Sequence, residues 1–302
     1  MNALDIIQLI VSSSLIYAAP LILTALGGTF SERSGVVNIG LEGIMVMGAF
    51  MSAIFNIFFA STFGGWTPWL GLLAGGIIGI VFSLIHAVAT INLRADHIIS
   101  GTVINLAAPA LGVFLTRAIF GAAQTGPLPE SFGITNIFLL HKIPIIGPIL
   151  FGNTSAPAFF GIVIAIISWF VLFKTTFGLR LRSVGEHSHA AETLGIKVYA
   201  MKYSGVMLSG LLGGMGGAIQ AQAISNEFGI LTIAGQGFIA MAAMIFGKWN
   251  PIGVMGAAIF FGFGQSLARI GTYIPIIQDI PSILLLIMPY LLTIIVLVVV
   301  IG

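Results

Sequence analysis

The sequence predicts an all-α, polytopic membrane protein with about nine transmembrane helices, and three properties of the chain support this class. Apolar residues make up 58% of its 302 residues. Charged residues make up only 7%, whereas a soluble chain of this length carries about 75 of them. A soluble globular domain needs a polar surface, which so few charged residues cannot supply. A disordered chain needs low hydrophobicity, so the composition excludes both of these classes. The 39 glycines suit helices that pack closely in lipid.

Nine apolar stretches approach the roughly 20 residues that a membrane-crossing helix needs. The polar turn 31–35 separates the first two, and Arg94–His97 separates the third from the fourth. A proline-rich loop, 120–154, and the hydrophilic segment 174–202 lie on either side of the fifth. The seventh is short and predicts a re-entrant segment or a broken helix. The expected spans are 6–27, 39–61, 67–91, 98–119, 155–174, 203–223, 234–247, 250–269 and 278–301.

The basic residues predict the orientation of these spans. When the loops alternate across the membrane, eight of the eleven basic residues fall on one side, which is cytoplasmic by the positive-inside rule. The N-terminus is then outside, the C-terminus is cytoplasmic, and 174–202 is cytoplasmic. The N-terminal apolar stretch lacks a basic leader and a cleavage site, so we expect it to be retained. No linker divides the chain, and residues 1–302 are expected to form one transmembrane domain.

Nothing in the sequence predicts an enzyme or a cofactor site. The chain has no cysteine, which excludes disulfides, thiolate metal sites and cysteine nucleophiles. Gly247-Lys248-Trp249 does not continue into an ATP-binding loop, and Gly235–Ala240 matches a dinucleotide motif only in spacing, inside an apolar span. His187 and His189 have no partner cluster, so no metal site is predicted. The net charge of +2 is spread between apolar runs, which indicates orientation in a membrane, not a nucleic-acid partner.

Polar and aromatic side chains within the spans are the candidates for a substrate pathway, because polar groups are costly in lipid. Amides both donate and accept, which suits an uncharged polar cargo. A cap is the alternative role for Asn38, and Glu42 could instead oppose the helix dipole or pair with Arg33. Either phenylalanine could stack on a base or face lipid; Gln265 is a further amide. The candidates are Asn38, Glu42, Asn105, Gln220, Gln222, Gln236, Phe261 and Phe263.

Two further patterns predict contacts between helices and between proteins. Pairs of glycines four residues apart predict close helix packing, above all in 203–223. In the hydrophilic segment 174–202, Ser188 can cap a short helix that Gly195 ends. The small side chains of this short helix predict a small protruding surface that fits a groove on another protein. The alternative is a solvated loop without a partner. The glycine pairs are Gly71/Gly75, Gly210/Gly214 and Gly213/Gly217.

Four stretches of the chain resemble permeases of bacterial ABC importers for nucleosides. These permeases belong to the larger group that serves ribose, other simple sugars and branched-chain amino acids. The resemblance extends from about residue 20 to about residue 270. The matching stretches are Ser31–Gly43, Ser100–Ala107, Gly178–Glu186 with Ala190-Ala191 and Gly195, and Gly237–Pro251.

The resemblance implies the fold, partners and location of the chain. The fold would be the type II ABC importer transmembrane domain, in the bacterial cytoplasmic membrane. The implied partners are ATP-binding cassette ATPase subunits, a second related permease in a heterodimer, and an extracytoplasmic substrate-binding protein. ATP hydrolysis would occur in the partner, and this chain would need no cofactor. The residues implied to couple it to the ATPase are Glu186, Ala190, Ala191, Glu192 and Gly195.

We therefore expect a permease subunit that moves nucleosides by alternating access, driven by separate ATPase subunits. Riboflavin or a simple sugar is the alternative cargo of the same class. An ATP-independent secondary transporter is the alternative class; it often uses an intramembrane carboxylate as a proton relay, for which Glu42 is the strong candidate. A scaffold or receptor that transports nothing would need no polar cavity.

Overall fold

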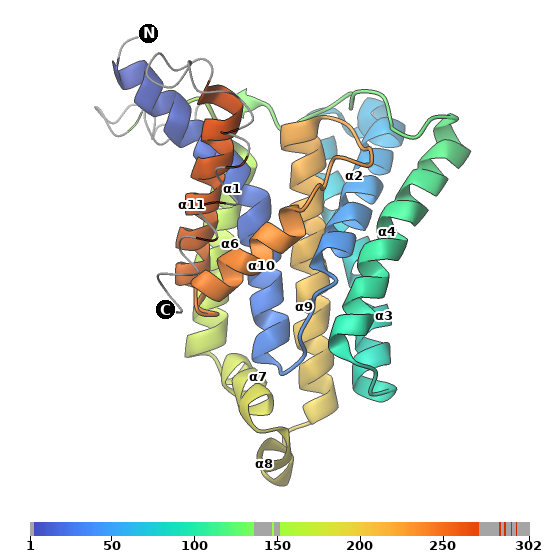
Figure 1. The fold of residues 1–302 in the computed structure, drawn as a ribbon, viewed down its shortest axis with the longest axis vertical. Helices are drawn as coiled ribbons and strands as arrows, with labels where there is room; N and C mark the ends of the chain where they lie inside the picture. Colours follow the sequence, from blue (N-terminus) through green and yellow to red (C-terminus); the bar gives the residue numbers. More distant parts are fainter. Residues whose placement is uncertain are drawn as a thin grey trace.

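The chain forms a bundle of long helices that stand side by side, and two short helices, α7 and α8, project from one end of it (Figure 1). This end is called the α8 end below. The computed structural model describes residues 3–135 and 152–271, with isolated positions 147, 284, 287, 291 and 294. Its elements are α1 (Ala3–Arg33), α2 (Leu41–Phe63), η1 (Gly64–Trp66), α3 (Thr67–Ala87), η2 (Val88–Asn92), α4 (His97–Phe120), β1 (Ile134–Thr135), β2 (Thr154–Ser155), α6 (Ala156–Lys174), α7 (Thr176–Glu186), α8 (Ser188–Thr193), α9 (Val198–Ile219), η4 (Gln220–Ser225), α10 (Gln236–Phe246) and α11 (Pro251–Ile270).

The first eight predicted spans fall on helices of the structure, which confirms the all-α class. The ninth, 278–301, lies outside the described residues apart from isolated positions, as does 136–151 of the predicted 120–154 loop. Within the described part of the chain, five helical stretches are long and apolar enough to cross a membrane, one being the 52-residue stretch Leu41–Asn92 that holds α2 and α3. The count of nine spans stays a prediction.

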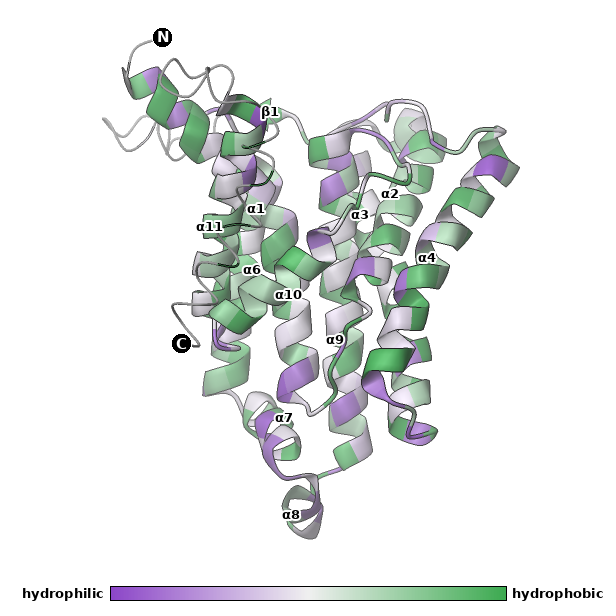
Figure 2. Ribbon diagram, viewed as in Figure 1, coloured by the Kyte–Doolittle hydropathy of each residue, from purple (hydrophilic) through white to green (hydrophobic). Residues whose placement is uncertain are grey.

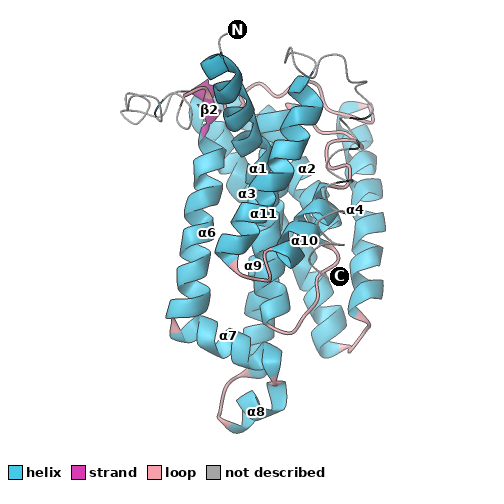
Figure 3. Ribbon diagram, turned by 60° about the vertical axis from the view of Figure 1, so that its left-hand side comes forward, coloured by secondary structure: helices cyan, strands magenta, loops and turns pink. Residues whose placement is uncertain are grey.

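The surface of the bundle is apolar along its length and polar at its ends. Hydrophobic residues cover the outer helices, whereas hydrophilic residues gather on α7, α8 and the connecting loops (Figure 2). Helix α4 exposes large apolar side chains, with Leu106 72% exposed and Phe114 66% exposed. Such a continuous apolar surface is stable against lipid or another chain and not in water. The short ribbon of β1 and β2, paired antiparallel, lies at the end opposite α8 (Figure 3).

Helix α9 packs at the centre of the bundle against α1, α2 and α3. The predicted glycine contacts are present: Gly214 lies against the backbone of Gly75, and a Cβ at Gly217 would overlap the carbonyl oxygen of Met45. Glycine leaves no side chain between two backbones, so the helices approach closely enough for dispersion contacts along their length. Helix α9 then continues into η4, a stretch of π-helix.

Helix α2 begins inside the bundle, because the chain turns back into it after α1 (Figure 1). Asn38 Nδ2 donates a hydrogen bond to Ser209 Oγ, 3.0 Å away at the middle of α9. Asn38 Oδ1 accepts from the Gly40 N–H at 3.1 Å, in a turn that precedes α2. Helix α10 also begins inside the bundle and has 11 residues. At 1.5 Å per residue it is about 16 Å long, too short to cross a membrane alone.

Replacement of Gly217 by alanine tests the central packing. The added methyl group would overlap the Met45 carbonyl, and we expect a loss of about 2 kcal/mol of stability, as for overpacked cores. Thermal unfolding of the purified protein in detergent measures the loss. Gly256→Ala is the matched control, because a Cβ at Gly256 meets open space and alanine favours helix. Equal unfolding temperatures for the two variants would contradict this packing.

Candidate functional site

The carboxylate of Glu42, in the first turn of α2, binds the N-terminus of α10. Its Oε1 accepts the Gly235 N–H at 2.7 Å, and its Oε2 accepts the Gly237 N–H at 2.6 Å. These N–H groups have no partner within α10, and the positive end of the helix dipole favours a carboxylate there. A Cβ at Gly237 would lie within 2.6 Å of the Glu42 backbone, so glycine permits this approach. The carboxylate therefore joins two helices that both begin inside the bundle.

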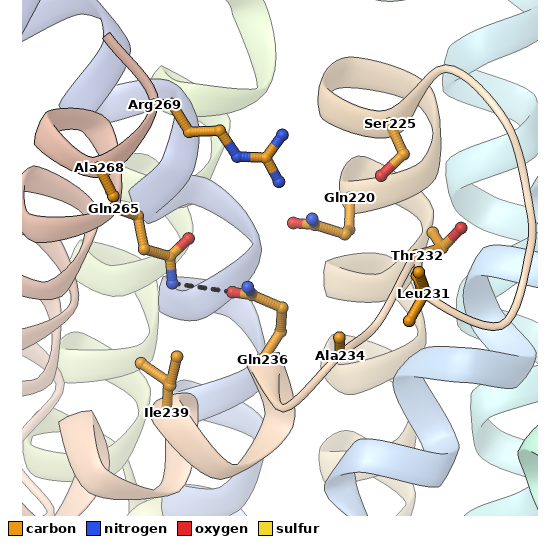
Figure 4. Close-up of a pocket in the computed structure, with 10 residues that line it drawn as sticks. All are labelled: Gln220, Ser225, Leu231, Thr232, Ala234, Gln236, Ile239, Gln265, Ala268 and Arg269. Carbon is orange, nitrogen blue, oxygen red and sulfur yellow. Dashed lines mark hydrogen bonds between the residues drawn. The ribbon is translucent and has the colours of Figure 1, made fainter. Parts of the chain in front are cut away.

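A polar cavity of about 200 Å³ lies beside this contact, between η4, α10 and α11. Side chains from all three elements point into it, and three amides and a guanidinium face one another (Figure 4). The described residues that line the cavity include no carboxylate. Its polar side chains belong to Gln220, Ser225, Thr232, Gln236, Gln265 and Arg269.

The amides around the cavity retain unused hydrogen-bonding capacity. Gln265 Nε2 donates to Gln236 Oε1 at 2.9 Å. This bond does not use the Gln236 NH₂ group, which can donate, or the Gln265 carbonyl, which can accept. The side chain of Gln220 is buried, and its Oε1 has no hydrogen-bond partner in the described part of the chain. An unpaired buried carbonyl costs about 1–3 kcal/mol, so this oxygen marks a position for a donor group on a ligand.

Other predicted pathway amides make contacts between helices. Gln222 Oε1 accepts from Asn56 Nδ2 at 2.8 Å, and its Nε2 donates to the Pro68 carbonyl at 3.1 Å. Asn105 Oδ1 accepts from the Gly43 N–H at 2.8 Å, and its Nδ2 donates to the backbone just before α2. These groups, like Asn38, lie outside the cavity lining.

The two predicted aromatic residues also lie apart from the cavity. Phe261 is fully buried and stacks on Phe246, with ring centroids 5.6 Å apart. Phe263 is partly exposed and lines an apolar groove that Ile10 and Phe159 also border. Among the predicted pathway residues, Gln220 and Gln236 line the cavity, as does Gln265, the further amide.

The sequence reasoning missed Arg269 as a cavity residue. It follows Gln265 by four positions, so the two side chains lie on the same face of α11. A cation one helical turn beyond an amide within an apolar span was the available signal. The alternative to a pathway role for Glu42 was a contact with its own helix dipole or with Arg33. Its carboxylate binds α10, and the guanidinium of Arg33 lies 3.9 Å from Glu186.

A second cluster of functional side chains lies at the α8 end. The predicted short helix is present, but its capping residue is His187, whose Nδ1 accepts the Ala190 N–H at 3.2 Å. Ser188 instead donates to the Val184 carbonyl. Gly195 has a φ of +79°, a backbone conformation that glycine adopts readily and that ends the helix here.

The exposed surface of α8 differs from the expected one at two positions. Ala191 is buried within the chain, whereas Ala190, Glu192 and Gly195 are exposed. Leu194 is 81% exposed, and the sequence reasoning did not name it. Leu194 is an apolar residue in a hydrophilic segment, directly before the glycine that ends α8. This pattern was the available signal for an exposed apolar contact.

Arg33 connects α7 to the turn between α10 and α11. Its guanidinium reaches Glu186 Oε1 and donates to the carbonyl oxygens of Trp249 and Lys248, at 3.2 and 3.4 Å. The Trp249 indole N–H donates to Glu32 Oε2 at 2.5 Å. Lys248 and Trp249 both have positive φ angles, which are uncommon for residues other than glycine.

Within the described residues, no group of three or more histidine or acidic side chains could hold a metal ion.

An apolar bundle with broken helices around an internal polar cavity defines a membrane transport protein. The chain belongs to the family of permease components of branched-chain amino acid transport systems, whose profile matches residues 10–300. It is a multi-pass membrane protein and a transport component of ABC systems.

Three characterised relatives place the chain within this family. It is 59% identical to the nucleoside ABC transporter permease protein NupC of Lactococcus lactis, over all of this chain and 95% of the relative. It is 55% identical to the guanosine ABC transporter permease protein NupQ of Bacillus subtilis, over 97% of this chain and 92% of the relative. It is 25% identical to a second guanosine ABC transporter permease protein of that organism, NupP, over 87% of this chain and 74% of the relative. No solved structure matches the chain.

Replacement of Glu42 by glutamine tests the contact with α10. A glutamine side chain accepts through one oxygen and turns its NH₂ group toward the second backbone N–H, so we expect a loss of about 2 kcal/mol of stability. Thermal unfolding in detergent measures this loss. Glu227→Gln makes the same chemical change at a carboxyl group outside this contact and should unfold as the wild type does. An unchanged unfolding temperature for Glu42→Gln would show that the carboxylate does not hold α10.

Proposed function

We propose that the chain is the nucleoside-translocating permease subunit of an ATP-driven importer in the bacterial cytoplasmic membrane. The observation that carries this proposal is the 59% identity, along the whole chain, to a permease named for nucleosides. The cavity supports it, because its described lining offers amides, hydroxyls and a guanidinium but no carboxylate, which suits a neutral cargo rich in donors and acceptors. The chain itself catalyses nothing in this proposal.

The energy for transport enters through α8, which docks on an ATP-binding cassette subunit. The small exposed helix, with Leu194 at its tip, fits a groove on a partner. This assignment puts the α8 end in the cytoplasm, the N-terminus outside and the C-terminus in the cytoplasm. The coupling residues are Glu186, Ala190, Ala191, Glu192 and Gly195, with Leu194 added to them.

A chain of contacts leads from α8 to the cavity. Helix α7 precedes α8 and meets Arg33 through Glu186, and Arg33 holds the turn at the C-terminal end of α10. The N-terminal end of α10 carries Gln236 into the cavity. A displacement of α7 therefore reaches the cavity wall through one short helix, about 16 Å long.

A second permease completes the transport unit in this proposal. The space that the described residues enclose, about 200 Å³, is smaller than the roughly 300–1,000 Å³ of typical ligand sites, which leaves room for a further wall from a second permease. Two guanosine permease proteins of Bacillus subtilis both resemble this chain, at 55% and 25% identity, which supports a heterodimer of related permeases. An extracytoplasmic binding protein delivers the cargo.

The contacts of Glu42 weigh against an ATP-independent secondary transporter. A proton relay needs a carboxylate that can take up and release a proton during the cycle. Both oxygens of Glu42 accept backbone N–H groups, and protonation would break one of these bonds. This carboxylate therefore has a structural role, and energy from a partner ATPase remains the better explanation.

Replacement of Leu194 by aspartate tests the proposed function and its coupling. In vesicles that hold the complete transporter, we expect ATP-dependent nucleoside uptake to fall at least about tenfold, since a buried charge would oppose docking. Leu194→Met, which stays apolar, should retain uptake. Western blotting of the membranes confirms insertion of each variant.

Three results would contradict the proposal. If the Leu194→Asp variant takes up nucleosides at the wild-type rate, α8 does not couple this chain to the ATPase. Uptake that persists without ATP would indicate a secondary transporter. Accumulation of riboflavin or a simple sugar, with no accumulation of any nucleoside, would show that the cargo is not a nucleoside.

Replacement of Arg33 by alanine tests the connection between α7 and α10. The variant loses the contacts to Glu186 and to the turn after α10, so we expect ATP hydrolysis to persist while nucleoside uptake per ATP falls several-fold. Arg33→Lys keeps the charge without the planar set of donors and should give an intermediate ratio. Parallel measurement of uptake and phosphate release gives the ratio. An unchanged ratio in Arg33→Ala would rule out this route.

A further inference from the structure

We propose that Arg269, aided by Gln220, makes this cavity select the 6-oxopurine nucleosides guanosine and inosine, whose base has a carbonyl oxygen beside N7, over the 6-aminopurine adenosine. The inference rests on the proposed function and deepens it, because it names the side chains that distinguish one base from another.

Arg269 is the charged side chain among the described residues that line the cavity, and these neighbours leave its donors available. The other polar groups of this described lining are amides and hydroxyls, and it includes no carboxylate to bind the guanidinium. The Arg269 Cζ lies 6.0 Å from the centre of the Tyr17 ring, where a cation–π contact supports it. Its guanidinium points across the cavity toward Gln220 (Figure 4).

The guanidinium can read only acceptors, because it has five N–H donors and no acceptor. A 6-oxopurine presents two acceptors side by side, O6 and N7, and arginine binds this pair through two hydrogen bonds. Adenine presents an amino group in place of O6, so Arg269 would face a donor. Arginine cannot exchange donor for acceptor by rotation, whereas an amide can. Arg269 is therefore the discriminating group.

Gln220 supplies the complementary acceptor. Its Oε1 is buried and lacks a hydrogen-bond partner in the described part of the chain, and its side chain points into the cavity. The N1–H of a 6-oxopurine is a donor that such an oxygen accepts, whereas N1 of adenine is an acceptor. N1–H lies on the Watson–Crick edge of the base, next to O6, so a 6-oxopurine whose O6 and N7 meet Arg269 can also offer Gln220 the partner it lacks.

The Gln236–Gln265 pair has a different role. Its remaining NH₂ and carbonyl ends can bind hydroxyl groups, which donate and accept alike. Ribose hydroxyls are common to all nucleosides, so this pair holds the cargo without distinguishing its base. Uridine presents its O4 carbonyl beside a C–H group in place of the O6/N7 pair, so it should rank between the 6-oxopurines and adenosine.

The experiment measures initial uptake of guanosine, inosine, uridine and adenosine by the complete transporter in vesicles. The guanosine-to-adenosine uptake ratio of each variant is divided by the wild-type ratio, which cancels the contribution of the unchanged binding protein. In Arg269→Gln we expect this quotient to fall about tenfold, the discrimination that one arginine–purine pair provides. Inosine should fall in parallel with guanosine, because both carry O6 and N7.

Two control variants keep the test decisive. Gln236→Ala should lower the uptake of all four nucleosides by one common factor and leave the quotient near one. Arg269→Lys retains a charge but not the paired donors, and its quotient should lie between those of Arg269→Gln and the wild type.

The outcomes separate this inference from the proposed function. A quotient near one for Arg269→Gln, with nucleoside uptake still measurable, overturns the role of Arg269 and leaves the permease function intact. A fall for guanosine that inosine does not share also overturns it, because the 2-amino group would then be the recognised feature. Absence of uptake of every nucleoside by the wild-type transporter overturns the proposed function itself.

Discussion

The two hydrogen bonds of the Glu42 carboxylate are the interaction on which the site depends. They join the first turn of α2 to the N-terminus of α10, two helices that begin in the interior of the bundle. Free backbone N–H groups in a low-dielectric interior are costly, and a carboxylate satisfies two of them while opposing the helix dipole. Gln236 lies between the two N–H donors along the chain, so the same contact sets where its amide enters the cavity.

The bundle combines a close-packed centre with a helical hairpin that is held at both ends. Helix α9 meets α2 and α3 through glycines that leave no space between backbones, and the cost of overlap prevents these helices from sliding. Helices α10 and α11 form a hairpin whose turn is held by Arg33 and whose inner end is held by Glu42. In the proposed cycle α9 and η4 carry the fixed side of the cavity, and the hairpin carries the side that moves.

The sequence predicted the class of fold well, because apolar length is a local property that each span displays by itself. It also predicted the short helix α8 and the glycine contacts of α9, which depend on spacing over a few residues. It could not predict the partner of Glu42, because Gly235 and Gly237 are almost 200 positions away and carry no side chain to suggest a bond. The exposure of Leu194 and the place of Arg269 in the cavity likewise depend on how distant segments pack.

The central claim, that the cavity is opened and closed from the α8 end, can be tested by a distance measurement across the cavity. The chain has no cysteine, so Ser225→Cys and Ala268→Cys place two spin labels on opposite walls without other changes. In the complete transporter, pulsed electron resonance should give one distance without nucleotide and a different distance when ATP is trapped on the ATPase subunits. A single unchanged distance in both states, in a preparation that still transports nucleosides, would contradict the account.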